Sequence, residues 1–217
     1  MHSTISPVPT AAAEPVKARR NLRWRVVDIV VASVVGVASG VIFWAWGLAW
    51  GPLSAALAFT PGLGGMLAGG WLFAGVLGGL IIRKPGAALY TELVAATVSA
   101  LIGTIWGFET LIWGLVQGLG AELVFALFFY ANWRIGVALL AGATTGLAVG
   151  LLDTTFTSYA ALDIGAKVTY VVSAIVSGVF IAGLLSWFAV RGLAATGALS
   201  RFASGRQANI VADASGR

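Results

Sequence analysis

Carboxylates, an amide and indole rings occur together in one apolar stretch of this sequence, from Trp106 to Phe125. Polar groups in hydrocarbon are costly, so those that persist usually face the interior of a helix bundle or a ligand. Indole rings attract cations by about 0.5–2 kcal/mol, and carboxylates accept hydrogen bonds from amino groups. We therefore predict one wall of a pocket for a flat, cationic aromatic ligand. Its predicted contacts are Trp106, Glu109, Trp113 and Gln117.

Two further carboxylates lie in the helices expected on either side of a turn near Gly107. Glu92 shares a helical face with small and polar residues. A hairpin with that turn would place Glu92 and Glu122 at one depth, roughly 20 Å from the turn. We predict both as ligand contacts, with local pairing to hydroxyls or an arginine as the alternative. On a straight helix, however, Glu122 points about 140° away from Gln117, so the helix must bend or Glu122 faces another neighbour.

Three tryptophans, Trp44, Trp46 and Trp50, end the first apolar stretch near the level expected for Trp106 and Trp113. Tryptophans are common in the belt at the membrane interface, which explains their position as well as a pocket does. We include Trp44 and Trp46 among the predicted ligand contacts and keep the interfacial belt as the alternative.

The composition identifies an integral membrane protein. Of the 217 residues, 59% are hydrophobic and only 10% are charged, against about 25% charged in soluble domains. The chain has no cysteine, and its single histidine is His2. Neither a phosphate-binding loop nor a hydrolase motif is present. We therefore expect no enzyme activity, no cofactor and no metal site.

The breaks in the apolar pattern predict six transmembrane helices. No charged residue occurs from Ile29 to Ile82, which is too long for one span, and Gly51-Pro52 and Thr60-Pro61-Gly62 divide it. The predicted spans are 26–50, 62–82, 86–105, 109–131, 135–152 and 166–190, with an uncharged loop at 51–61 and a polar loop at 153–164.

Three regions follow from these spans: a disordered basic tail at 1–22, a transmembrane domain at 23–190 and a flexible basic tail at 191–217. Twelve of the 13 basic residues fall on one side, and only Lys167 falls on the other. Cytoplasmic loops carry the excess of basic residues, so both termini are predicted to be cytoplasmic. This distribution follows membrane topology and gives no indication of nucleic-acid binding.

Small residues recur at spacings of four, which allows helix backbones to approach closely. Gly65/Gly69, Gly75/Gly79 and the row Gly142, Gly146, Gly150 are predicted to pack within the bundle. The row Ala32, Gly36 and Gly40 in the first span is predicted to dock another membrane subunit, with internal packing as the alternative.

The sequence resembles the YkoE family of substrate-capture (S) components of energy-coupling-factor (ECF) transporters. The similarity extends over residues 22–190 and is carried by Arg23–Ala32, Phe43–Trp46, Ile82–Gly86, Glu92 and Gln117–Phe125. It implies a six-helix bundle in the bacterial cell membrane with an outward-facing pocket for thiamine or its hydroxymethylpyrimidine precursor. It also implies assembly with a transmembrane T component and cytoplasmic ATPases, in which small residues of the first helix, here Ala32, Gly36 and Gly40, contact the T component.

Two other functions remain open from the residues alone. The first is an ion-coupled carrier or channel in which Glu92 and Glu122 relay protons. The second is a structural membrane subunit without a ligand.

Overall fold

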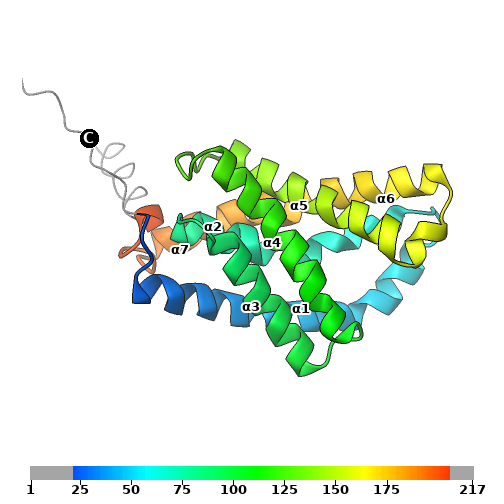
Figure 1. The fold of residues 1–217 in the computed structure, drawn as a ribbon, viewed down its shortest axis with the longest axis horizontal. Coiled ribbons are helices and arrows are strands. Elements are labelled where there is room, and N and C mark those ends of the chain that lie inside the picture. The colour runs from blue at the N-terminus through cyan, green and yellow to red at the C-terminus, as the bar shows by residue number, and fades with distance from the viewer. Residues whose placement is uncertain (1–21, 206–217) are drawn as a thin grey trace, which may run out of the picture.

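A computed structural model describes residues 22–205, which form a bundle of helices with no strand in that range (Figure 1). The predicted N-terminal tail, apart from Leu22, and the final part of the predicted C-terminal tail, 206–217, lie outside the described residues.

Six apolar helical segments make up the bundle and confirm the predicted all-α membrane fold. Five are long and apolar enough to cross a membrane, and α3 (Ala87–Ile102) has 16 residues. The first segment is α1 (Val26–Leu57), and the second combines the 3-10 helix η1 (Leu63–Trp71) with α2 (Phe73–Ile82). After α3 comes the 3-10 turn η2 (Gly107–Glu109), which leads into α4 (Thr110–Leu127). The fifth segment is α5 (Ile135–Phe156), followed by the 3-10 helix η3 (Ser158–Ala161). The sixth is a continuous run of α6 (Ile164–Ser177), the π-helical η4 (Gly178–Leu185) and α7 (Ser186–Ala195).

Several predicted helix boundaries are wrong. The helices α3 and α4 end earlier than predicted, at Ile102 and Leu127. In contrast, α5 continues to Phe156, into the polar loop predicted at 153–164.

The first helix continues through Pro52 to Leu57, where a loop was predicted. A proline inside a helix removes one backbone hydrogen bond, but Gly51 and Pro52 are exposed at the end of the span, where water can satisfy the freed carbonyl. The last helix continues to Ala195 beyond the predicted end at 190.

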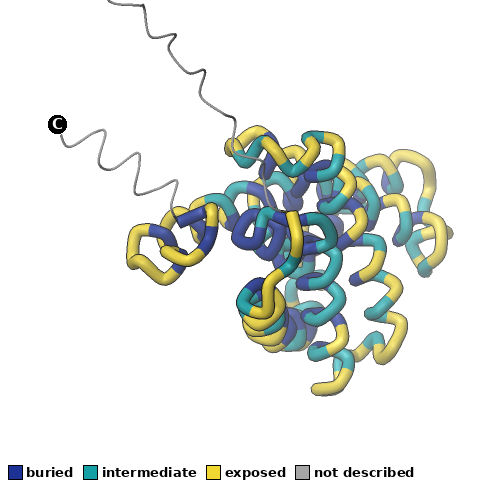
Figure 2. Tube along the Cα trace, turned by 60° about the vertical axis from the view of Figure 1, so that its left-hand side comes forward, coloured by how far each residue is buried: buried dark blue, intermediate teal, exposed yellow. Residues whose placement is uncertain are grey.

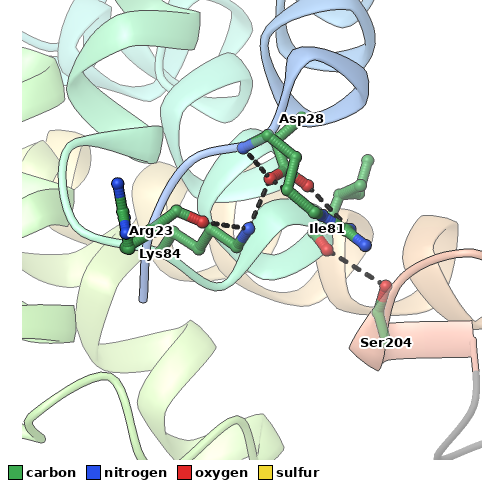
Figure 3. Close-up of polar contacts among 6 residues, drawn as sticks. Arg23, Asp28, Ile81, Lys84 and Ser204 are labelled. Carbon is green, nitrogen blue, oxygen red and sulfur yellow. Dashed lines mark hydrogen bonds and ion pairs between the residues drawn. The ribbon is translucent and has the colours of Figure 1, made fainter. Parts of the chain in front are cut away.

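The chain after α7 also packs on the bundle within the described residues. Phe202 is 3% exposed, and the Ser204 hydroxyl donates to the Ile81 carbonyl at 3.1 Å (Figure 3). The region predicted as a tail from 191 therefore begins with the end of α7 and includes buried residues before 205.

A buried ion pair ties the start of α1 to the turn between α2 and α3. The Asp28 carboxylate is fully buried and accepts from the Arg25 amide at 2.7 Å. It pairs with Lys84 and, at 3.0 Å, with the Arg25 guanidinium. The Lys84 ammonium also donates to the Arg23 carbonyl at 2.6 Å (Figure 3). Both ends of the described chain lie at this end of the bundle (Figure 1).

The small-residue rows pack inside the chain. Buried positions gather where helices meet, and exposed positions lie on the outer faces (Figure 2). Gly142 and Gly178 face each other, and Gly146 faces Ala174, so the row in α5 packs within the bundle, as predicted, and its neighbour is the last helical segment.

The row in α1 also faces a helix of the same chain, which is the internal packing given above as the alternative to docking a partner. Ala32 is fully buried. A Cβ added to Gly36 would lie 2.7 Å from Val94 Cβ, and one added to Gly40 would lie 2.7 Å from Val98 Cβ. The missing side chains are therefore what lets α1 approach α3, and Ala32, Gly36 and Gly40 are covered in this structure.

Substitution of Gly36 by alanine tests this packing. Because the added methyl group overlaps Val94, we expect Gly36→Ala to lower the free energy of unfolding by about 1–3 kcal/mol. Thermal unfolding of purified protein in detergent measures the effect. Gly136→Ala is the matched control, because nothing lies within 4 Å of its added Cβ; equal stability of the two variants would show that α1 and α3 do not pack this closely.

Candidate functional site

A cavity of about 380 Å³ lies among α1, η1, α3, α4, α5 and α6, beside the turns η2 and η3. Trp50 on its wall lies roughly 33 Å along α1 from Asp28, at the other end of the bundle. Eight aromatic side chains line the cavity: Phe43, Trp50, Trp71, Trp106, Trp113, Phe156, Tyr159 and Tyr170. Its polar lining includes Glu109, Asp153 and Gln117, with hydroxyl groups of Thr104, Thr110, Thr157 and Ser158.

Glu122 caps the start of α3 and does not line the cavity. Its carboxylate accepts from the backbone amides of Gly86 at 2.6 Å, Ala88 at 3.0 Å and Leu89 at 3.4 Å. The Tyr130 hydroxyl donates to it at 2.7 Å. The first amides of a helix have no partner within the helix, so Glu122 supplies one from α4. Its predicted contact with a ligand is not supported.

The predicted depth of Glu92 and Glu122 is wrong by about one helical turn. A Cβ on Gly118 would lie 3.2 Å from Glu92 Cβ, so Glu92 faces Gly118, and Glu122 faces the start of α3. The pairing of α3 with α4 differs from the prediction because α3 ends early, at Ile102. The turn then begins at Gly103, which has a φ of 108°. The two carboxylates therefore have separate partners, which removes the basis for a proton relay between them.

Glu92 caps α2 inside the bundle and lies behind the cavity wall. The Gly75 amide, in the first turn of α2, donates to its carboxylate at 2.5 Å. With its amide nitrogen turned toward the nearby acceptors, Gln117 donates to Glu92 Oε1 at 2.9 Å and to the Trp71 carbonyl at 3.0 Å. Glu92 is fully buried and is absent from the cavity lining. It reaches the cavity through Gln117 rather than directly.

Four of the six acidic residues in the described range thus accept hydrogen bonds from backbone amides at helix starts. Besides Glu92 and Glu122, Asp28 accepts from an amide at the start of α1, and Asp163 accepts from the amides of Gly165 and Ala166 at the start of α6. The remaining two acidic residues, Glu109 and Asp153, both line the cavity.

Asp153 is held by side chains of the cavity wall. Its two oxygens accept from the Trp113 indole and from the Tyr170 hydroxyl, each at 2.7 Å, and the residue is 8% exposed. Each carboxylate oxygen can accept a further hydrogen bond. The Tyr159 ring lies 4.5 Å from that of Tyr170. Burial, with the nearby Asp153 charge, raises the pKa of Tyr159, so its hydroxyl remains a donor at neutral pH.

Four indole rings meet around Trp71, and three of them, Trp50, Trp71 and Trp106, line part of the cavity wall. Trp71 makes ring contacts with Trp46, Trp50 and Trp106 at centroid distances of 6.2, 5.7 and 5.2 Å. Its indole nitrogen donates to the Phe43 carbonyl at 3.0 Å, which fixes the ring. This wall presents a rigid, electron-rich aromatic surface.

The structure brings four predicted residues together around the cavity: Trp106, Glu109, Trp113 and Gln117. Trp44 and Trp46 do not line it, although Trp46 packs on Trp71. Sequence reasoning missed Trp71, Asp153, Tyr159 and Tyr170 as lining residues. Asp153 was predicted in a loop, yet it continues the inward-facing row Gly142, Gly146, Gly150 in α5, and that spacing was the available signal.

Comparison with known proteins gives a consistent assignment. The family model described as the permease component of an ABC-type cobalt transport system matches residues 27–148. YkoE of Bacillus subtilis (strain 168), described as an HMP/thiamine permease protein, is 34% identical over 187 residues, which are 85% of this chain and 92% of that protein. A crystal structure of an S component of an ECF transporter superposes with a TM-score of 0.83 at 32% identity, over 89% of this chain and 98% of the other.

Carboxylates that cap helices and carboxylates that line the cavity should affect stability differently when they are removed. Removal of Glu122 leaves several amides of α3 without their acceptor, and an unsatisfied buried donor costs about 1–3 kcal/mol. We therefore expect Glu122→Ala to lower the unfolding temperature by several degrees. Glu109→Ala, the matched control, should leave it nearly unchanged, because Glu109 makes no capping hydrogen bond. Similar unfolding temperatures for both variants in detergent would contradict the capping role.

Proposed function

The chain belongs to the YkoE family of S components, the substrate-binding subunits of ECF vitamin importers in the bacterial membrane, and from that premise we propose that it captures thiamine or hydroxymethylpyrimidine (HMP). The ligand class follows the relative described as an HMP/thiamine permease. We further propose that the pocket opens to the outside and that the ligand is bound without chemical change.

The main support for this ligand is the way in which the acidic residues are divided between helix starts and the cavity. Four of the six described carboxylates bind helix starts, and the two that do not, Glu109 and Asp153, line the cavity together with eight aromatic side chains. Thiamine combines a cationic thiazolium ring with an aminopyrimidine. A cation is favoured beside carboxylates and indole faces, and an amino group can donate to the free acceptor positions of Asp153.

The cavity size is compatible with such a ligand. Small-molecule sites have volumes of about 300–1,000 Å³ and are mostly apolar with a few placed polar groups. The cavity of about 380 Å³ lies at the small end of that range, which suits a compact molecule of one or two rings.

Cobalt, named in the description of the matching family model, fits this cavity less well. Metals of this type prefer several nitrogen, sulfur or carboxylate ligands. In the part of the chain that the structure describes, no group of three or more such side chains is present. The lining instead offers aromatic rings with two separate acidic residues, so we propose an organic ligand.

We propose that a T component and cytoplasmic ATPases complete the importer, because the sequence contains no phosphate-binding loop of its own. The basic end of the bundle, with Arg83, Lys84 and Arg134, is proposed to face the cytoplasm. Purification of the tagged chain from its native membrane in mild detergent tests the assembly. Recovery of ATPase subunits would support it, and recovery of the chain alone would contradict it.

Substitution of Asp153 tests the ligand site. Asp153→Asn keeps the shape of the side chain but removes its charge, so we expect at least tenfold weaker binding of thiamine, measured by quenching of tryptophan fluorescence. Asp163→Asn is the matched control: it makes the same chemical change, and its side-chain oxygen still caps α6. Equal thiamine affinity of both variants would remove Asp153 from the site, and no quenching of the unchanged protein at micromolar thiamine would contradict the proposed ligand.

A further inference from the structure

The charges around the cavity have a consequence for phosphorylated ligands. The described residues that line it include two acidic and no basic side chains. Proteins that bind phosphate esters commonly use arginine or lysine side chains or the amides of a helix N-terminus. Each of these sources of positive charge can be located in the structure.

The helix start nearest the cavity already carries a negative charge. Glu109 is the N-cap residue of α4, and both Glu109 and Thr110 line the cavity. The positive end of the helix dipole favours one negative charge within the first turn. Because Glu109 provides that charge on the wall itself, a phosphate at this helix start would meet a carboxylate.

The other acidic group cannot move away from a phosphate. Asp153 is held by Trp113 and Tyr170 through both oxygens and is 8% exposed. Like charges repel more strongly in a poorly solvated site than in water. A ligand that extends a phosphate toward Asp153 would therefore face a fixed negative charge.

The basic residues lie elsewhere. Lys84 and Arg25 are paired with Asp28 at the other end of the bundle. On the cavity side of the bundle, Lys167 is half-buried in the first turn of α6 and does not line the cavity. No described basic side chain is therefore placed to neutralise a phosphate inside the cavity.

We infer that the cavity selects unphosphorylated ligands and rejects their phosphate esters. This inference rests on the proposed thiamine or HMP site and specifies its substrate class. It also places the protein in a reaction sequence: where a ligand is available only as a phosphate ester, hydrolysis of that ester must come before capture. The discrimination is assigned to Glu109 and Asp153 together.

Titration of the purified full chain with thiamine, thiamine monophosphate and thiamine diphosphate tests the inference through tryptophan fluorescence. We expect thiamine to bind at least 100-fold more tightly than either ester. Esters that bind within tenfold of thiamine would overturn the inference and leave the proposed function intact. No binding of any of the three would contradict the proposed function and, with it, the inference.

Charge reversal at the cavity wall provides a second measurement. In Glu109→Lys, we expect the preference for thiamine over its monophosphate to shrink at least tenfold, whereas Asp163→Asn, outside the cavity, should keep the unchanged preference. A preference that persists in Glu109→Lys would remove Glu109 from the discrimination. Should that variant fail to fold, the comparison of the three ligands on the unchanged protein still decides the inference.

Discussion

The need to satisfy backbone amides in the absence of water determines how this chain uses its few charges. In a bilayer, the amides at the start of a helix must find an acceptor within the protein. Glu92 and Glu122 supply acceptors to α2 and α3 from neighbouring helices. The buried Asp28 does so for α1, and the exposed Asp163 caps α6. The two acidic residues that remain, Glu109 and Asp153, are therefore free for the cavity that they line.

The break in the second span links this constraint to the cavity. Because η1 ends at Trp71 and α2 begins at Phe73, a helix start lies inside the bundle and requires Glu92. Gln117 then connects Glu92 to the Trp71 carbonyl and to the cavity wall. Trp71, at the same break, holds the cluster of indole rings together. One irregular segment thus positions both the amide and the aromatic surface of the site.

The sequence predicted the all-helical bundle and four residues of the cavity because hydrophobic pattern and polar residues within apolar stretches are local signals. It could not predict the partners of Glu122 or Asp153, since these depend on the register between helices. Gly103 shifted the α3–α4 pairing by about one turn, which separated Glu92 from Glu122. The row Ala32, Gly36 and Gly40 indicated close packing correctly, but its spacing alone did not reveal that α3, within the same chain, is the neighbour.

The decisive measurement is a crystal structure of the protein with bound thiamine. We expect the ligand to occupy the cavity, with its rings against the indoles of Trp71 or Trp106 and a donor or the cationic ring within about 4 Å of Asp153, while Glu92 and Glu122 remain bound to helix starts. Thiamine found outside this cavity, or bound through Glu122, would contradict the proposed site.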